Sequence, residues 1–355
     1  MLDKLKQGAL WVIGTAMPAP WRRHDLIRVA IQTCDGFDEP LWAGALDQEL
    51  PAWREKIELL CVTGDFAFRH AVSDADACST MTLSPLLFQH SRLKWINALP
   101  SGVNLIELPE LPTGLNLTTS RGIAARSMAE HALMLLLALR NQLPATCRNQ
   151  QAWKWSQEGL LGPGQDLREL TVAVFGLGAA GSEIAKICKA LGMRVIGVRR
   201  SAAIPDKLCD ESCLLADFTS VLPRVDAVFL ALPLTRTTRE LITDTVLMQM
   251  KRSAIIVNVA RGGLIREDHL AAALREGRIG GAGLDVLAAE PPAADSPLKN
   301  CPNLIVTPHI AGNLHKFRPE IAARFARNVA AFLAGRPLEG LLPRDHWNEH
   351  GEAGK

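Results

Sequence analysis

Short apolar runs alternate with polar, helix-like segments along most of the chain. In the first third of the sequence they occupy residues 27–31, 57–62, 77–81, 93–98 and 116–119. From residue 170 onward the runs contain almost no polar position, as is typical of strands covered on both faces. These later runs span 171–175, 194–198, 226–232, 254–259, 282–286 and 304–307. Strand alternating with helix predicts a parallel, doubly wound α/β sheet in each half of the chain.

The connection between the two series carries a predicted helix. Ser127 is followed at the third position by Glu130, which is a capping-box pattern, and the apolar segment 132–139 comes directly after it. This segment is far shorter than the roughly 20 residues that span a bilayer, so it predicts a buried helix and no membrane partner. A last helix is predicted over residues 319–333, with Gly335 ending it.

Composition narrows the class of protein. The length of 355 residues predicts two domains at roughly 150 residues each. Lys and Arg total 39 against 37 for Asp and Glu, a net charge of +2, which favours a small-molecule partner over nucleic acid. The eight cysteines form no C-x-x-C motif, which predicts reduced thiols and a cytoplasmic location. The apolar run 8–17 only superficially resembles a signal peptide, and residues 1–25 are expected to be an N-terminal extension.

The cysteine spacing and the absence of tyrosine argue against a metal site and against a catalytic phenol. Cys209 and Cys213 could form half of a metal site, but no second pair or nearby His completes it, so no metal is predicted. Tyrosine is absent from the sequence. This excludes the short-chain reductases, which use a Tyr-x-x-x-Lys pair, and the aldo-keto reductases. In any carbonyl reduction the proton would have to come from another side chain.

A glycine-rich motif follows the first strand of the second series. Gly176, Gly178 and Gly181 form the pattern G-x-G-x-x-G between a predicted strand and a predicted helix. The first glycine permits the tight turn, the second lets the backbone approach a pyrophosphate, and the third lets helix and strand pack closely. The helix N-terminus then faces the anion. The segment predicts a Rossmann dinucleotide site, with Ala179 and Ala180 inside the binding loop.

The end of the next strand bears on which dinucleotide binds. An acidic residue commonly accepts the ribose 2′-hydroxyl of NAD at this point, but the chain has Arg199, Arg200 and Ser201, with no acid before Asp206. Two guanidinium groups and a hydroxyl suit a 2′-phosphate. We therefore expect NADP(H), while NAD(H) stays possible if the arginines are solvated surface residues.

Three polar residues follow later strands of the same series. Arg261 follows the run 254–259, Glu290 follows 282–286 and His309 follows 304–307. The carboxyl ends of parallel strands form the ligand-binding edge of an open α/β sheet, so we expect the three side chains to share one crevice.

Their chemistry suits reduction of a 2-keto acid. A histidine can give the proton to the oxygen that becomes negative on hydride transfer, and a neighbouring glutamate would hold the ring and stabilise imidazolium. An arginine can bind a carboxylate bidentately and polarise the keto oxygen beside it. Asp285 is the other acid near this edge, and we expect it to orient the nicotinamide carboxamide.

Over residues 28–340 the chain resembles the D-isomer-specific 2-hydroxyacid dehydrogenase family. The matching segments are GLGAAG at 176–181, ALPLTRTT at 231–238, NVARGGLI at 258–265, GAGLDVLAAEP at 281–291 and TPHIAG at 307–312. The resemblance implies that Arg261, Glu290 and His309 are the catalytic set and that Asp285 contacts nicotinamide. Further cofactor contacts are implied at Leu232, Pro233, Thr238, Val259 and Ala260.

The resemblance also implies a domain organisation. A Rossmann NAD(P)-binding domain, residues 120–315, would be inserted into a flavodoxin-like substrate domain made of residues 1–119 and 316–355, and two copies would form a homodimer. The family loop that holds the substrate carboxylate often reads Gly-Ala-Gly-Val-Asp, whereas this chain has Pro100-Ser101-Gly102-Val103-Asn104. Pro100 removes one possible amide donor, which leaves Ser101, Gly102 and Val103 as the expected substrate contacts.

The resemblance leaves three functions open. The favoured one is a glyoxylate- or hydroxypyruvate-type reductase that interconverts a small 2-keto acid and its D-2-hydroxy acid. A second is another dehydrogenase built on the same fold, of the phosphite or phosphoglycerate type. Formate dehydrogenases resemble this fold but carry Gln where this chain has Glu290, which counts against them. A third is a cofactor-sensing binding protein like the transcriptional corepressors of the family.

Overall fold

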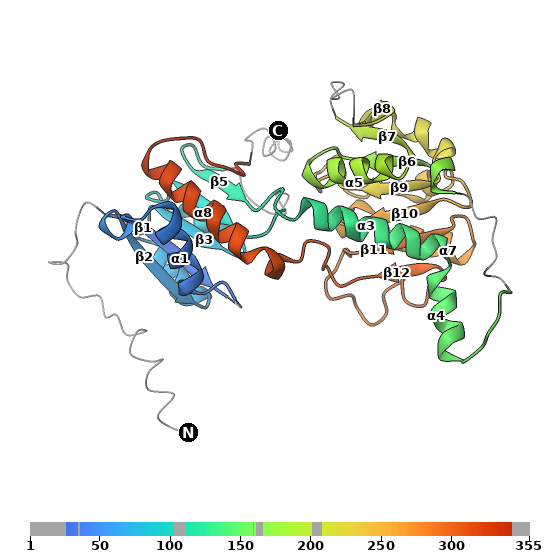
Figure 1. Cartoon of the computed structure of the whole chain (residues 1–355), viewed down its shortest axis with the longest axis horizontal. Helices are drawn as coiled ribbons and strands as arrows, with labels where there is room; N and C mark the ends of the chain where they lie inside the picture. Colours follow the sequence, from blue (N-terminus) through green and yellow to red (C-terminus); the bar gives the residue numbers. More distant parts are fainter. Residues whose placement is uncertain are drawn as a thin grey trace, which may run out of the picture. The chain divides into compact units, whose positions relative to one another are not determined.

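The structure, a computed structural model, describes residues 26–34, 36–102, 111–158, 160, 166–200 and 208–342. The predicted extension 1–25 and the residues Val103 and Ser201 lie outside these ranges. The described chain divides into two compact units (Figure 1). Among the described residues, the first unit contains those up to Ser120 and those from Phe317 onward, and the second unit contains those of Arg121–Lys316.

The first unit is built on a parallel sheet with strand order β2-β1-β3-β4-β5 in the described part of the chain. Its order is that of a flavodoxin-like doubly wound sheet. The helices of this unit are α1 (Glu39–Glu49), α2 (Asp65–Val72) and α8 (Arg318–Leu333). The strands are β1 (Ile27–Thr33), β2 (Ile57–Thr63), β3 (Ala77–Thr80), β4 (Trp95–Ala98) and β5 (Asn116–Thr119).

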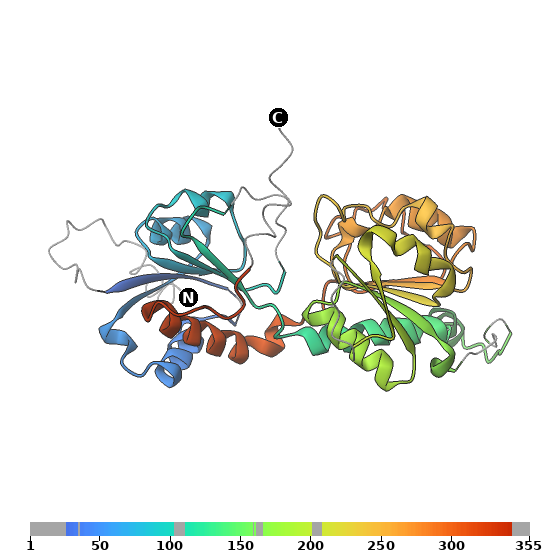
Figure 2. The same ribbon diagram turned by 90° about the horizontal axis from the view of Figure 1, so that it is seen from above.

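Helix α8 completes the core of the first unit, although it lies almost 200 residues beyond β5. It packs beside α1 (Figures 1 and 2). The buried ring of Phe325 meets Trp42 of α1 edge-on at 4.9 Å and stacks on Trp95 of β4 at 5.5 Å between ring centroids. Aromatic side chains bury much apolar surface each, so these contacts tie the last helix to the first sheet.

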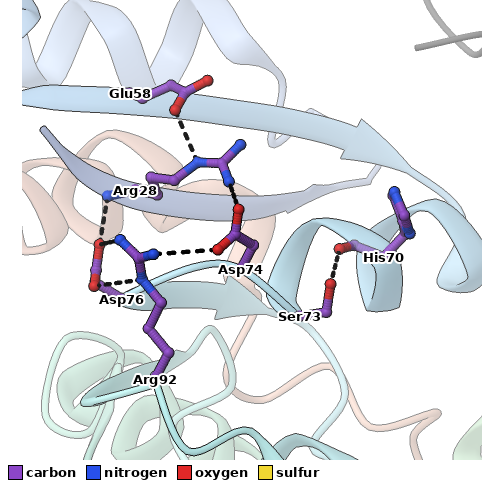
Figure 3. Close-up of polar contacts among 7 residues, drawn as sticks. All are labelled: Arg28, Glu58, His70, Ser73, Asp74, Asp76 and Arg92. Atoms are coloured by element: carbon purple, nitrogen blue, oxygen red, sulfur yellow. Dashed lines mark hydrogen bonds and ion pairs between the residues drawn. The ribbon is translucent and has the colours of Figure 1, made fainter. Parts of the chain in front are cut away.

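An ion-pair network fixes the amino ends of β1, β2 and β3 in the same unit (Figure 3). Arg28 donates from Nε to Glu58 at 2.8 Å and also pairs with Asp74. Asp76 accepts from the backbone N–H of Arg28 at 2.8 Å and from Arg92 Nε at 3.0 Å. The hydrogen bond to Asp76 raises the pKa of Arg92. The network therefore links the amino ends of the three strands to one another.

The second unit is a Rossmann-type sheet with the parallel order β12-β11-β10-β9-β6-β7-β8 in its described residues. Its strands are β6 (Thr171–Phe175), β7 (Arg194–Arg199), β8 (Glu211–Leu214), β9 (Ala227–Leu230), β10 (Ile255–Asn258), β11 (Gly281–Leu284) and β12 (Leu304–Val306). Its helices are α3 (Ala125–Arg140), α4 (Leu143–Gln151), α5 (Ala179–Ala190), α6 (Asp244–Leu247) and α7 (Glu267–Arg275).

Helices cover both faces of this sheet, as Figure 2 shows. Apolar residues of α3 and α5 pack on one face, with Leu135 and Ile184 among the buried side chains. Residues of α6 and α7 pack on the other face, where Leu247 and Leu270 are buried. Burial on both faces explains why the strands read as unbroken apolar runs.

Two predictions about local structure are wrong. Strand β8 was not expected, because its segment ESCL is half polar and forms an edge with only β7 beside it. The capping box at Ser127 does not form, because α3 begins a turn earlier, at Ala125, with Ala124 as its N-cap. Glu130 instead accepts from Arg126 one turn before it at 2.9 Å, so its carboxylate is not available to the helix N-terminus.

Candidate active site

The glycine loop lies between β6 and α5 and is shaped by close backbone contacts. Gly176 has φ +90°, and a Cβ there would stand 2.8 Å from the carbonyl oxygen of Ala231. A Cβ on Gly181 would stand 1.7 Å from the carbonyl oxygen of Gly176. Both positions therefore require glycine, the first for its backbone conformation as well as for space.

Gly178 has a different environment, since it is the N-cap of α5 and borders open space. Among the described residues, the one nearby atom is a guanidinium nitrogen of Arg121, 3.1 Å from where a Cβ would stand. The first turn of α5 thus presents backbone N–H groups beside a cation. This cradle fits the pyrophosphate of a dinucleotide, and Ala179 and Ala180 lie in that turn. Arg121 was missed by sequence reasoning, because it precedes the motif by more than 50 residues.

The end of β7 carries the two arginines predicted to select the cofactor. Arg199 is the last residue of the strand and Arg200 is exposed directly after it. The nearest described carboxylate further along the chain, Asp210, is held by Val195 and Lys189, at the amino end of this strand. Two guanidinium groups thus follow one another at the carboxyl end of β7.

The loop after β9 has a self-contained hydrogen-bond pattern. The hydroxyl of Thr238 donates to the carbonyl oxygen of Pro233 at 2.7 Å and accepts from the backbone N–H of Thr235 at 2.7 Å. This side chain is buried and shapes its own loop, so any cofactor contact here would come from the backbone. Leu232, Val259 and Ala260 are also buried.

Three neighbouring strands bring together the residues predicted to be catalytic. β10, β11 and β12 are adjacent and parallel, with Asn258 beside Leu284 and Leu284 beside Val306 in register. Arg261, Glu290 and His309 follow these strands in turn, at the same edge of the sheet.

His309 and Glu290 are hydrogen-bonded to each other. The distance between His309 Nδ1 and Glu290 Oε2 is 2.7 Å, and the two side chains are 49% and 38% exposed. The other carboxylate oxygen of Glu290 accepts from the backbone N–H of Leu287 at 2.9 Å, which orients it toward the ring. Because Nδ1 is engaged, Nε2 is the ring atom that can exchange a proton with a ligand.

Arg261 lies on a turn packed tightly against the loop before Glu290. A Cβ on Gly262 would stand 1.9 Å from the carbonyl carbon of Leu287, so the two backbones touch. Burial lowers the pKa of the Arg261 guanidinium, and the negative charge of Glu290 opposes that shift. A cation held in a partly buried setting next to a carboxylate is well placed to bind an anionic substrate group.

Two polar residues that sequence reasoning missed hold these loops. Asn258, fully buried at the end of β10, donates to the carbonyl oxygen of Arg261 at 2.9 Å and accepts from the N–H of Ala260 at 3.0 Å. Glu267, in the first turn of α7, accepts from the N–H of Ala288 at 2.7 Å. The asparagine at the end of an otherwise apolar strand was a signal that could have been used.

Asp285 is only 1% exposed and faces the loop that carries His309. Its carboxylate accepts from the backbone N–H groups of Ile310 at 3.0 Å and Ala311 at 2.9 Å and from the hydroxyl of Thr307 at 2.6 Å. His309 itself has φ +54°, a conformation that non-glycine residues adopt rarely. Asp285 therefore orders this loop, whatever it contributes to a bound nicotinamide.

Two more of the predicted site residues belong to the other unit. Ser101 and Gly102 belong to the first unit and follow β4. Cys209 is buried, and burial raises the pKa of its thiol. Within the described ranges, no cluster of three His, Cys, Asp or Glu side chains could bind a metal ion. In the same ranges, no helix has the length and apolar character to cross a membrane.

Comparison with known proteins agrees with this fold. Residues 133–311 match the NAD binding domain of D-isomer specific 2-hydroxyacid dehydrogenases. The glycerate dehydrogenase of Methylorubrum extorquens is 34% identical over 252 residues, which are 69% of this chain and 77% of that protein. The glyoxylate reductase of Aeropyrum pernix is 33% identical over 287 residues, which are 77% of this chain and 84% of that protein.

A solved structure extends the likeness to most of the chain. The D-isomer specific 2-hydroxyacid dehydrogenase from Xanthobacter autotrophicus Py2, in complex with NADPH and MES, has a TM-score of 0.74 and 26% identity. The match covers 90% of this chain and 99% of that one. The fold and its relatives thus define an NAD(P)-dependent oxidoreductase. The chain belongs to the D-isomer-specific 2-hydroxyacid dehydrogenase family. The predicted family, α/β fold class and enzyme class are confirmed.

Proposed function

We propose that the protein reduces a small 2-keto acid to its D-2-hydroxy acid, with NADPH as the preferred hydride donor. The observation that carries this proposal is the 2.7 Å pair of His309 and Glu290 at the same sheet edge as Arg261. The glycine loop and α5 supply the dinucleotide cradle on the same sheet.

Each of the three side chains has a chemical role in the proposal. The reduced nicotinamide, when bound, supplies a hydride to the keto carbon. His309 gives a proton from Nε2 to the keto oxygen, and Glu290 fixes the ring through Nδ1 and stabilises its protonated form. Arg261 binds the substrate carboxylate and polarises the keto oxygen. In the reverse direction His309 takes the proton back from the hydroxyl.

The preference for NADPH rests on Arg199 and Arg200 at the end of β7. Guanidinium groups form strong charge-assisted hydrogen bonds with phosphate, and the relative from Xanthobacter autotrophicus was solved with NADPH. NAD(H) binding is the alternative.

The relatives named glycerate dehydrogenase and glyoxylate reductase support glyoxylate and hydroxypyruvate as substrates. We place the cofactor domain at residues 120–315 and the substrate domain at 1–119 and 316–355. The substrate contacts Ser101, Gly102 and Val103, the homodimer and the cytoplasmic location stay predictions from the sequence.

A substrate panel tests the proposal. Purified protein is assayed with glyoxylate, hydroxypyruvate, pyruvate and longer 2-keto acids, each with NADPH and with NADH, and the absorbance of the reduced cofactor is followed. We expect NADPH oxidation with at least one short keto acid. If the protein binds NADPH but oxidises it with none of them, the reductase proposal is wrong and a cofactor-sensing role is favoured.

A variant tests the role of His309. We expect His309→Ala to lower kcat by roughly 10²- to 10⁴-fold, as is typical on loss of a general acid, with the Kd for NADPH unchanged. The control is His70→Ala, an exposed position on α2 of the first unit. Near-normal turnover of His309→Ala would rule out its acid role.

A further inference from the structure

A second histidine approaches the candidate active site from α3 and takes no part in the chemistry proposed above. The ring of His131 places Nε2 at 2.9 Å from the hydroxyl of Thr307 and at 3.4 Å from a carboxylate oxygen of Asp285. Its side chain is 14% exposed and that of Asp285 is 1% exposed. A charged group this deeply buried is stable only when neighbouring donors satisfy it.

The hydrogen bonds among these three groups have a defined direction. An ionised carboxylate can only accept, so the single hydroxyl proton of Thr307 goes to Asp285 at 2.6 Å. The hydroxyl oxygen is then left as an acceptor for His131. Therefore His131 donates from Nε2 to the hydroxyl oxygen of Thr307, and Thr307 in turn donates to Asp285.

This series of hydrogen bonds ends on the loop that carries His309. Asp285 also accepts from the backbone N–H groups of Ile310 and Ala311. The N–H of His309 lies 2.9 Å from both the carbonyl oxygen of Asp285 and that of Thr307. The residues on each side of His309 are thus bound to one carboxylate, which holds His309 in its unusual backbone conformation.

Helix α3 provides a firm base for this contact. It packs against α5 and against β10, β11 and β12. Leu135 and Ala132, on the turn that follows His131, are fully buried. A donor fixed on such a helix can restrain a loop at the sheet edge, because packed side chains leave little room for the ring to move.

We propose that His131 is a positioning residue, which acts through Thr307 and Asp285 to hold the 307–311 loop and so to aim His309 at the substrate. The proposal rests on the proposed function for its kinetic part only. Displacement of a catalytic group by about 1 Å can cost about 100-fold in rate. Loss of the donor at His131 therefore affects turnover through Thr307 and Asp285.

The experiment compares His131→Leu, His131→Gln, Thr307→Val and the double variant His131→Leu/Thr307→Val. Leucine removes the donor, whereas glutamine retains an N–H on a side chain of similar reach. We expect His131→Leu to lower kcat roughly 10- to 100-fold and to leave the Kd for NADPH unchanged. His131→Gln should recover most of the rate. The double variant should be no slower than the slower single variant, because both changes break one chain of hydrogen bonds.

The matched control is Lys251→Met at the opposite edge of the same sheet. Lys251 donates to Asp226 at 2.8 Å, and Asp226 is a buried carboxylate like Asp285 but lies at the amino end of β9. We expect both Lys251→Met and His131→Leu to lose stability, and only His131→Leu to lower kcat.

Amide hydrogen exchange separates this inference from the proposed function. Without the His131 donor, the N–H groups of Ile310 and Ala311 should exchange faster in the apoenzyme, whether or not any keto acid is turned over. Unchanged exchange there, equal kcat losses in His131→Leu and Lys251→Met, or multiplying effects in the double variant would overturn the positioning role. A wild-type protein that reduces no keto acid would refute the proposed function alone.

Discussion

The substitution Asp285→Asn distinguishes a loop-ordering carboxylate from one that only contacts a cofactor. The change keeps the size of the side chain but replaces one accepting oxygen with an NH₂ group. If the amide oxygen takes the position that accepts from Thr307 and Ile310, the NH₂ group faces the N–H of Ala311, which now lies 2.9 Å from a carboxylate oxygen. Two donors then face each other.

The expected loss of stability follows from these contacts. Ala311 is 2% exposed, so water cannot replace the lost acceptor, and an orphaned buried donor costs about 1–3 kcal/mol. The bonds from Thr307 and Ile310 become neutral, and a neutral bond is worth about 1 kcal/mol less than one to a charged group. Removal of a buried charge offsets part of this cost. We expect the free energy of unfolding of the second unit to fall by about 2–4 kcal/mol.

The assay uses the apoenzyme, followed by denaturant titration and by amide hydrogen exchange of the 307–311 segment. The control is Asp226→Asn, which breaks a buried carboxylate at the other edge of the sheet, where it accepts from Thr171 at 2.9 Å. Both variants should be destabilised, but only Asp285→Asn should also lower kcat. If apo Asp285→Asn is as stable as the wild type and only its Kd for NADPH rises, Asp285 serves the nicotinamide and does not order the loop.

Three further predictions concern other groups. Glu290→Gln keeps a hydrogen-bond acceptor for His309 but loses the charge that stabilises the protonated ring, so kcat in steady-state assays should fall about 10-fold; an unchanged kcat would leave Glu290 without its proposed role. Arg199→Asp should lower the ratio of kcat/KM for NADPH to that for NADH at least about 10-fold, and a constant ratio would show that the arginine does not bind the 2′-phosphate. Burial raises the pKa of the Cys188 thiol to about 12, so little of this thiol is ionised at about pH 8. A disulfide reagent should then label the exposed Cys147 before Cys188, which mass spectrometry can follow. Labelling of Cys188 should grow only as the pH approaches its pKa or the protein unfolds.

The sequence predicted strands well where burial is complete. Runs such as 171–175 and 254–259 contain β6 and β10 because both faces of a central strand must be apolar. β8 was missed because it is an edge strand with one neighbour and none of its four residues is fully buried, so the segment looks like a polar turn. Runs of apolar residues therefore predict the central strands of such a sheet but not this edge strand.

Helix boundaries were less predictable because they depend on contacts outside the local motif. The pattern at Ser127 and Glu130 would suit a helix start, but the chain already turns at Gly122, with φ +90°, and the N–H of Ala125 bonds back to its carbonyl oxygen. A helix that begins there leaves Ser127 inside its first turn. Local capping energy of about 1 kcal/mol is easily overridden by such a constraint.

The positions of Arg261, Glu290 and His309 at strand ends could be predicted, since parallel strands end at one edge whatever their order. The residues that hold these three side chains in place could not be predicted in this way. His131 and Thr307 are 176 positions apart, and their contact depends on α3 crossing the face of β10, β11 and β12. Only the folded arrangement of helix and strands reveals which polar groups meet.

One arrangement is repeated at all three strand ends. Each loop that carries a proposed catalytic side chain is held by a polar side chain of another residue: Asn258 binds the Arg261 turn, Glu267 binds the loop before Glu290, and Asp285 binds the loop of His309. Since the supporting groups hydrogen-bond to backbone atoms, they fix where each loop lies without using the reactive side chains. Loss of any one support should therefore lower kcat more than it weakens cofactor binding.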